Sequence, residues 1–349
     1  MLGRESRTVD VLCVGGGLAA QVLHLPVLAK DPRVGRLYCV ERQALRVAAL
    51  RARFGDRVVP VEQHQVLDLL PVDLAVVATE DASHAELAAA LVGAGCNVFV
   101  EKPLALTASS ADGIAQAART AGRHLFVGYQ RLWDPALELA RDALRAYGPP
   151  PLVHMHDVCH DNGAALKRYA PWTQAPSFAD GATDQRPLSG VEQELVAHWS
   201  GGSPLVYRLF LNLCCHDLSV LCSLFRDVAV ENAVLESEAA MAAHFRAGET
   251  LIAFEAAVTR RPWFDQRLRM DWPDTSLEVL WPSPFDPGRR FRFGRMWDAI
   301  LDTCLAARED VVADAADSLS NALAVARVID DVIEADLVRL ARPGRGVPR

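Results

Sequence analysis

The first apolar run of the chain leads directly into three consecutive glycines. Residues 9–15 read VDVLCVG and are typical of a buried strand, and the residues that follow Gly17, LAAQVLHLPVLAK, are typical of a helix. The turn between them carries the pattern G-x-G-x-x-A at Gly15, Gly17 and Ala20. Gly15 permits a tight turn out of the strand, and Gly17 lets the main chain approach a diphosphate. This strand–turn–helix unit therefore predicts a dinucleotide-binding domain at the start of the chain.

Apolar strands and helical patterns alternate from this turn to residue 128. Further strands are expected at 36–41, at 72–79 and in the runs NVFV and HLFV, and helices over 44–54, 83–94 and 107–121. The strands are continuously apolar, which is typical of a parallel sheet covered on both faces. We therefore assign residues 1–128 to an N-terminal doubly wound Rossmann domain of the α/β class.

The second half of the chain has a different pattern. A strand is expected at 151–158 and a helix at 204–226, followed by five strand candidates with turns at 247–249 and 273–274, and by closing helices near 295–307 and 313–336. Residues 129–336 are therefore predicted to form a C-terminal α+β domain with an open, mostly antiparallel sheet. The polar segment 159–203 is expected to be a long loop, and residues 337–349 a disordered tail.

Composition excludes several classes of partner. The chain has 349 residues, 51% of them hydrophobic, and a net charge of −8 from 36 basic and 44 acidic side chains. An acidic balance argues against nucleic acid and against an anionic membrane surface, which call for a basic face. No apolar run approaches the ~18 residues of a membrane span. The eight cysteines contain no CxxC pair, a usage typical of free thiols in a reducing compartment, so we expect a cytoplasmic location.

The residues around the glycine turn are candidates for holding a dinucleotide. Leu18 and Ala19 open the helix, whose first amides have no intrahelical partner and favour phosphate. Glu41 ends the second strand, where a carboxylate binds ribose hydroxyls and repels a 2′-phosphate. The neighbouring Arg42 would instead favour NADP. We expect NAD(H) in preference to NADP(H); the alternative is a structural glycine turn beside a solvated Glu–Arg pair.

A second candidate site is the tripeptide Glu101, Lys102 and Pro103, which follows the strand NVFV. The carboxyl end of a strand is the edge where doubly wound sheets bind ligands. A lysine near nicotinamide and substrate would stabilise charge that develops on a substrate oxygen. An ordinary surface turn with an exposed ion pair would have the same sequence.

The predicted helix at 204–226 carries a third candidate site. At about 100° per residue, Arg208, Asn212, His216 and Ser219 share one helix face. His216 alone among them is suited to proton exchange near neutral pH. Such a stripe is equally typical of a solvent-facing surface.

Three further residues are candidates for substrate binding. Tyr129 and Arg131 follow the last predicted Rossmann strand, although Arg131 also suits an interdomain ion pair. His156 shares a strand face with His154 near Cys159. Because no second cluster at ligand spacing accompanies these histidines, no metal site is expected. His156 is instead a candidate substrate contact if its sheet face borders the active cleft.

Taken together, these segments resemble the Gfo/Idh/MocA family of NAD(P)-dependent oxidoreductases. The resemblance is strongest over residues 9–135 and rests on GGGLAAQVLHLP, VDLAVVATEDASHAELAAALVGAGCNVFVEKPLALT, LFVGYQRLWDP and CHDLSVLCSLF. It implies a Rossmann domain followed by a domain whose open sheet makes dimer or tetramer contacts, and therefore a homodimer or homotetramer. It also implies the following roles: Gly15, Gly17 and Glu41 bind the dinucleotide, Thr79 and His84 line the cofactor cleft, Glu101 and Lys102 lie at the nicotinamide, and His216 is the acid/base.

One departure from the family pattern concerns the proton relay. Asn212 stands where members of the family often carry an aspartate four residues before the histidine. An amide orients a hydroxyl, but it takes up no proton and has no charge with which to raise a neighbour's pKa.

The leading hypothesis is an NAD(P)-dependent oxidoreductase of a bacterial biosynthetic pathway. It would move a hydride between nicotinamide and a secondary alcohol or ketone of a sugar, cyclitol or similar polyol. Lys102 and His216 would be catalytic, with Asn212 and Arg208 orienting the substrate. One alternative uses bound NAD transiently for elimination, epimerisation or glycoside cleavage. Others are imine reduction and an NAD(P)-sensing regulatory protein.

Overall fold

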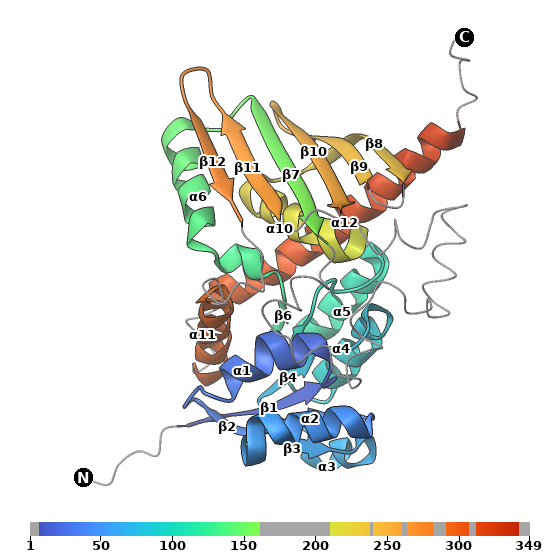
Figure 1. Ribbon diagram of the computed structural model, residues 1–349, viewed down its shortest axis with the longest axis vertical. Coiled ribbons are helices and arrows are strands. Elements are labelled where there is room, and N and C mark those ends of the chain that lie inside the picture. The colour runs from blue at the N-terminus through green and yellow to red at the C-terminus, as the bar shows by residue number, and fades with distance from the viewer. Residues whose placement is uncertain are drawn as a thin grey trace. The chain divides into compact units, whose positions relative to one another are not determined.

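The computed structural model forms two compact units, each built on its own sheet (Figure 1). It describes residues 7–160, 210–237, 240–259, 264–281, 291–306 and 312–341. Of these, the first unit holds the residues up to Trp133, those from 291 to 306 and those from 312 to Leu323. The remainder belongs to the second unit. The predicted boundary after residue 128 therefore lies five residues before the observed one.

The first unit contains six parallel strands in the order β3-β2-β1-β4-β5-β6. They are β1 Val9–Val14, β2 Val34–Val40, β3 Val59–Val61, β4 Leu74–Val77, β5 Asn97–Val100 and β6 Leu125–Val127. This order reverses direction between β1 and β4, which is the point where doubly wound sheets bind dinucleotides. The predicted Rossmann fold is confirmed, with β3 as an additional short edge strand.

Helices connect these strands: α1 Leu25–Leu28, α2 Ala44–Phe54, α3 Val66–Leu69, α4 His84–Gly93 and α5 Ala108–Ala121, with single helical turns at Gly55–Arg57, Gln63–Gln65, Asp81–Ser83 and Gln130–Trp133. Helix α5 shows why the predicted boundaries are close. The Thr107 hydroxyl accepts the Ser110 N–H at 3.2 Å, and Gly122 ends the helix with φ of +61°. Both satisfy main-chain groups that a helix end leaves without partners.

The helix after the glycine turn is not uniform. A π-turn at Ala20–His24 precedes α1. Pro26 has no N–H with which to close an α-helical bond to Val22, and a wider turn directly before it accommodates this loss. Gln21 and His24 both point inward from the π-turn and are fully buried.

Helix α11, Phe291–Leu305, belongs to the first unit although it lies late in the chain. Its buried side chains join the core of β1, α1 and β5, and they are Phe293, Met296, Trp297, Ile300, Leu301 and Cys304. The Arg33 guanidinium also binds the carboxylates of Asp298 at 2.5 Å and Asp302 at 2.6 Å. The assignment of all residues 129–336 to the second domain is therefore wrong for α11, because its apolar face is buried against the Rossmann core.

The second unit contains a mixed sheet in the order β12-β11-β7-β10-β9-β8. Its strands are β7 Leu152–His160, β8 Ala229–Ser237, β9 Ala240–Ala247, β10 Thr250–Thr259, β11 Asp265–Asp271 and β12 Ser276–Leu280. Within the described strands of this sheet, only β7 and β10 pair in parallel. In β9, buried and more exposed residues alternate, as expected when one face is covered. The prediction of a mostly antiparallel sheet is confirmed.

The helices of the second unit are α6 Pro135–Tyr147, a π-turn at Phe210–Cys214, α10 Cys215–Leu224 and the end of α12 Val312–Ala341. Because α12 continues to Ala341, residues 337–341 are helical where the sequence predicts a tail. Residues 159–160 end β7, and the rest of the predicted loop, 161–203, lies outside the described residues. Among the described helices, none combines the length and the apolar character needed to cross a membrane.

Trp297 offers a test of the docking of α11. Its side chain is fully buried, with its ring 4.8 Å from that of Phe99. Trp297→Ala should lower the free energy of unfolding by about 3–5 kcal/mol, because it leaves a large cavity. In urea unfolding, the matched control Leu45→Ala, 62% exposed in the same unit, should change it by less than about 0.5 kcal/mol. Equal effects of the two changes would contradict this packing.

Candidate active site

The loops that leave the parallel strands of the first unit meet at the carboxyl edge of the sheet. They carry the glycine turn after β1, Glu41 after β2, Thr79 after β4, and Glu101 with Lys102 after β5. The parallel order brings these four predicted positions to one edge, although they are far apart in the sequence.

The backbone around Gly15 has room for no residue other than glycine. Its φ is +98°, and an added Cβ would lie 2.5 Å from the carbonyl oxygen of Ala78. Its N–H donates to the carbonyl of Val40 at 3.0 Å. No L side chain fits a main chain held this closely between β2 and the end of β4, so the predicted role of Gly15 in the turn agrees with the geometry.

Gly17 differs from Gly15, because the protein leaves open space beside it. An added Cβ would meet no heavy atom within 4 Å, and φ lies outside the left-handed region. The adjacent Leu18 and Ala19 begin the helix, where the amides have no intrahelical acceptor. Open space beside outward-facing amides is the arrangement that a diphosphate needs. The residues present therefore fit a dinucleotide.

Glu41 lies where the sequence places it, at the end of β2, but its carboxylate turns toward the loop. Its Oε2 accepts the Gly16 N–H at 3.1 Å, and its Oε1 accepts the Gln43 N–H at 2.8 Å. Arg46 Nη1 lies 3.8 Å from Oε2, and the Glu41 side chain is only 6% exposed. The neighbouring Arg42 is exposed. Glu41 therefore braces the glycine turn besides carrying a negative charge at this edge.

His84 has a different environment from the open cleft wall that the resemblance implies. The ring is buried, with Nδ1 2.7 Å from the carbonyl oxygen of Pro103 and Nε2 3.4 Å from that of Thr79. The Thr79 hydroxyl lies 2.7 Å from the hydroxyl of Ser83. His84 therefore links the loop after β4 to the turn after β5.

Glu101 is buried and does not form the exposed ion pair that its sequence also allows. Its Oε1 lies 2.7 Å from Nε2 of His24, and its Oε2 accepts the N–H of Lys102 at 3.1 Å. Burial by itself would raise the pKa of Glu101. The hydrogen bond from His24, with the charges of His24, Lys102 and His84, instead holds this pKa below its usual range. The carboxyl is therefore ionised at neutral pH.

His24 is a residue of this edge that the sequence patterns do not predict. The one available signal was a histidine in the otherwise apolar helix that follows the glycine turn. That signal is weak, because its partner Glu101 lies 77 residues later.

In the second unit, the predicted helix stripe is only partly described. His216 lies on α10 and is partly buried, and the Ser219 hydroxyl donates to its carbonyl at 2.6 Å. Ser219 is fully buried, so its hydroxyl serves the helix. Arg208 and the side chain of Asn212 lie outside the described part of the chain. The π-turn before α10 also turns less than 100° per residue, so the predicted face does not continue unchanged through it.

His156 does not join His216. It lies on the outer face of the second sheet, with Nδ1 2.6 Å from Glu255 and Nε2 3.4 Å from Asp265. Its neighbour Asp157 is buried on the other face, the one covered by the turn before α10, where Cys214 Sγ lies 3.3 Å from Met241 Sδ. Strand alternation therefore places the sheet between His156 and α10, so the two predicted site residues His156 and His216 do not lie on the same side of it.

Two further predicted substrate contacts are covered. Tyr129 and Arg131 are 1% and 3% exposed. No three His, Cys, Asp or Glu side chains come together as metal ligands in the described ranges.

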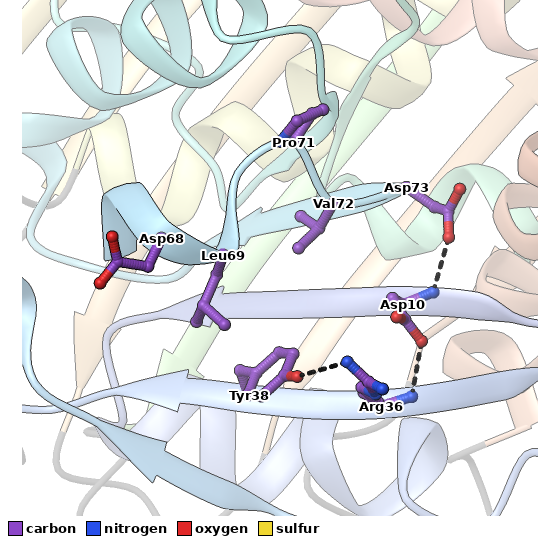
Figure 2. A pocket seen from close by; sticks show the side chains of 8 residues that line it. All are labelled: Asp10, Arg36, Tyr38, Asp68, Leu69, Pro71, Val72 and Asp73. Carbon is purple, nitrogen blue, oxygen red and sulfur yellow. Dashed lines mark hydrogen bonds between the residues drawn. The ribbon is translucent and has the colours of Figure 1, made fainter. Parts of the chain in front are cut away.

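A hollow of about 180 Å³ lies at the opposite edge of the first sheet (Figure 2). Figure 2 shows the Asp10 carboxylate beside the N–H of Arg36 and the Asp73 carboxylate beside the N–H of Asp10, at 2.8 and 2.9 Å. These acidic side chains hold the starts of β1, β2 and β4 together. They lie at the amino ends of the strands, away from the glycine turn.

The amino-terminal part of the chain, which carries this edge, is similar to a known family. Residues 9–129 match the model of the oxidoreductase family with an NAD-binding Rossmann fold, Gfo/Idh/MocA. Inositol 2-dehydrogenase 1 of Saccharopolyspora erythraea is 36% identical over 172 residues, 47% of this chain and 49% of that protein. The scyllo-inositol 2-dehydrogenase (NADP(+)) IolW of Bacillus subtilis is 28% identical over 133 residues, 38% and 36% of the two chains. The matched segments therefore span half or less of these relatives.

The structural similarity to solved proteins covers nearly the whole chain. The crystal structure of scyllo-inositol dehydrogenase from Lactobacillus casei with bound NAD(H) and scyllo-inositol has a TM-score of 0.68. The alignment covers 94% of this chain and 97% of that one at 15% sequence identity. At this identity the likeness concerns the fold alone, and it covers both sheets.

The contrast between the two glycines of the turn gives a matched test. Gly15→Ala should lower the free energy of unfolding by about 2 kcal/mol or more, because the new Cβ meets a carbonyl at a strained φ. Gly17→Ala should change it by less than about 0.5 kcal/mol, because the new methyl group meets open space. Urea unfolding of both variants is the measurement, and a similar loss in both would contradict the turn geometry.

Proposed function

We propose that this chain, whose amino-terminal domain belongs to the Gfo/Idh/MocA oxidoreductase family, is an NAD(P)-dependent dehydrogenase acting on a secondary alcohol of a cyclitol or sugar-like polyol. The observation that carries the proposal is the carboxyl edge of the first sheet. There Gly17, Glu41 and Lys102 follow the carboxyl ends of β1, β2 and β5, on either side of the point where the strand order reverses, and Gly17 has open space beside it. The names of the relatives, inositol dehydrogenases, support a cyclitol as the substrate class.

The chain's own residues would bind and orient the dinucleotide. The amides of Leu18 and Ala19, together with the helix dipole, would hold the diphosphate beside Gly17. Glu41 would accept hydrogen bonds from the adenosine ribose hydroxyls with lone pairs that the loop amides leave available. When bound, the nicotinamide gives or takes the hydride.

Lys102 is proposed as the group that stabilises charge on the reacting oxygen. An ammonium aimed at an oxygen that becomes an alkoxide strengthens its interaction in the transition state. His216 is proposed as the acid/base that exchanges the hydroxyl proton, because imidazole changes its charge near neutral pH. Asn212 and Arg208 are proposed to orient hydroxyl groups of the substrate.

The reaction would consume a secondary alcohol and an oxidised dinucleotide and yield a ketone, a reduced dinucleotide and a proton. Myo-inositol and scyllo-inositol with NAD⁺ and NADP⁺ are the first substrates to assay, by absorbance of the reduced nicotinamide. Absence of any dinucleotide binding would contradict the proposal directly.

Removing the lysine ammonium should affect the rate of the chemical step and leave dinucleotide binding nearly unchanged. Lys102→Ala should lower kcat at least about 100-fold while the dissociation constant for NADH changes little, because the ammonium acts mainly on the transition state. His216→Asn should lower kcat by about 100-fold and flatten the pH profile around neutrality. The control Lys30→Ala removes the ammonium of an exposed lysine and should leave kcat unchanged. Normal turnover by Lys102→Ala would contradict its assignment.

We propose that NAD(H) is preferred to NADP(H), because the charge of Glu41 opposes a 2′-phosphate. NAD⁺ should then raise the melting temperature more than NADP⁺ at equal concentration. Glu41→Gln should reduce this difference, since it removes the charge and keeps an acceptor for the Gly16 N–H. Glu86→Gln, an exposed change on α4, should leave it intact. A larger shift with NADP⁺ in the wild type would reverse the assignment and favour Arg42 or Arg46 as phosphate ligands.

A further inference from the structure

The contact between His24 and Glu101 joins the helical segment after the glycine turn to the loop after β5, and both flank the proposed nicotinamide end of the site. His24 leaves the π-turn after the glycine loop, and Glu101 follows β5. Their facing atoms, Nε2 and Oε1, lie 2.7 Å apart, and the imidazole is fully buried. A hydrogen bond to a carboxylate at this distance and in this surrounding is strong.

The imidazole of His24 is held by aromatic rings on its other sides. The rings of Phe99, Trp297 and Phe293 approach it edge to face, with centroids 5.2, 5.5 and 6.2 Å away. Its Nδ1 has no hydrogen-bond partner in the part of the chain that the structure describes. Glu101 is therefore the polar partner that sets the direction of the ring.

The carboxylate of Glu101, whose orientation His24 fixes, also binds the main chain of Lys102. Its second oxygen accepts the main-chain N–H of Lys102 at 3.1 Å. On another side, Gly128 leaves room for the carboxylate, since an added Cβ there would lie 3.2 Å from Oε1. The charged neighbours that act on Glu101 are His24, Lys102 and His84. The backbone of Lys102 is thus tied through one carboxylate to a ring buried in the core.

We propose that His24 is a positioning residue for the dehydrogenase reaction, holding Glu101 in the one orientation that fixes the main chain and charge environment of Lys102. This inference rests on the proposed function, because its kinetic consequence requires that Lys102 act on the substrate. His24 itself reaches no substrate, as its side chain is fully buried.

Replacement of the imidazole by another ring separates positioning from packing. His24→Phe keeps an aromatic side chain among the three surrounding rings and removes the hydrogen bond to Glu101. His24→Gln instead keeps an amide donor close to the position of Nε2. We expect kcat of His24→Phe to fall about 10- to 100-fold, with KM and the dissociation constant for NADH within about twofold of the wild-type values. His24→Gln should recover most of the loss in kcat.

The pH profile should move in a defined direction. The hydrogen bond of His24 lowers the pKa of Glu101, whereas burial raises it. Without His24, burial remains, so Glu101 should take up its proton at higher pH. The acidic limb of kcat against pH should therefore move to higher pH in His24→Phe, and His24→Gln should move it less. A role limited to packing would leave the limb in place.

A double variant tests whether the effect passes through Glu101. If His24 acts by orienting this carboxylate, His24→Phe should cost much less in the Glu101→Gln background than in the wild type. If the two substitutions acted independently, their fold-losses in kcat would instead multiply in the double variant. Melting temperatures of all three variants report any general loss of folding. A fall in kcat that follows the melting temperature and multiplies with Glu101→Gln would overturn the proposal.

A readout without substrate distinguishes this proposal from the proposed function. The chain has only three lysines, Lys30, Lys102 and Lys167. Reductive methylation with ¹³C-formaldehyde therefore gives three side-chain signals besides the amino terminus, and single Lys→Arg variants assign them. His24→Phe should change the shift and the pH titration of the Lys102 signal and leave the Lys30 signal unchanged.

The proposed function and the positioning role of His24 can fail independently of each other. If the wild-type protein binds no dinucleotide and oxidises neither inositol, the proposed function fails, and the Lys102 signal alone decides whether His24 positions this lysine. If the wild-type protein is active but His24→Phe leaves both the Lys102 signal and the pH profile unchanged, the positioning role is overturned while the proposed function stands. A changed signal with the kinetic split supports both.

Discussion

The left-handed turn at Gly15 is the constraint on which the proposed site depends. The carbonyl of Ala78 leaves no room for a side chain there, so β1 can turn beside the end of β4 only at a glycine. The same turn begins the helical segment whose π-turn directs His24 into the core. It also leaves the amides at the start of the helix beside the open space at Gly17. One backbone conformation thus positions both the amides proposed to bind the diphosphate and the histidine proposed to support Lys102.

Two carboxylates hold this edge in place. Glu41 accepts the amides of Gly16 and Gln43, and Glu101 binds His24 and the amide of Lys102. Hydrogen bonds to an ionised carboxylate are stronger than those between neutral groups. Each acidic residue therefore stiffens the loop on which it lies before any dinucleotide binds. A site arranged in advance loses less entropy when it binds and reacts.

Part of the fold could be read from the sequence because hydrophobic period and turn residues act locally. Helix α2 has the predicted bounds, 44–54, and the five strand candidates from residue 228 onward are confirmed as strands β8 to β12. Helix α6 was missed although Asp134 caps it through the Ala136 N–H at 2.9 Å and Pro135 opens it. The docking of α11 had no comparable signal, because the sequence does not say which of two cores an apolar helix face will join.

The sequence alone determined the glycine turn, the parallel character of the first sheet and the positions of Glu41 and Lys102 at strand ends, since these follow from residues within successive strand–turn–helix units. Only the tertiary structure decided where side chains point. Glu101 turns inward to His24 and His84 is buried between two loops, while alternation along β7 sends His156 away from α10. These outcomes depend on contacts between residues distant in the chain, and local propensity carries no information about such partners.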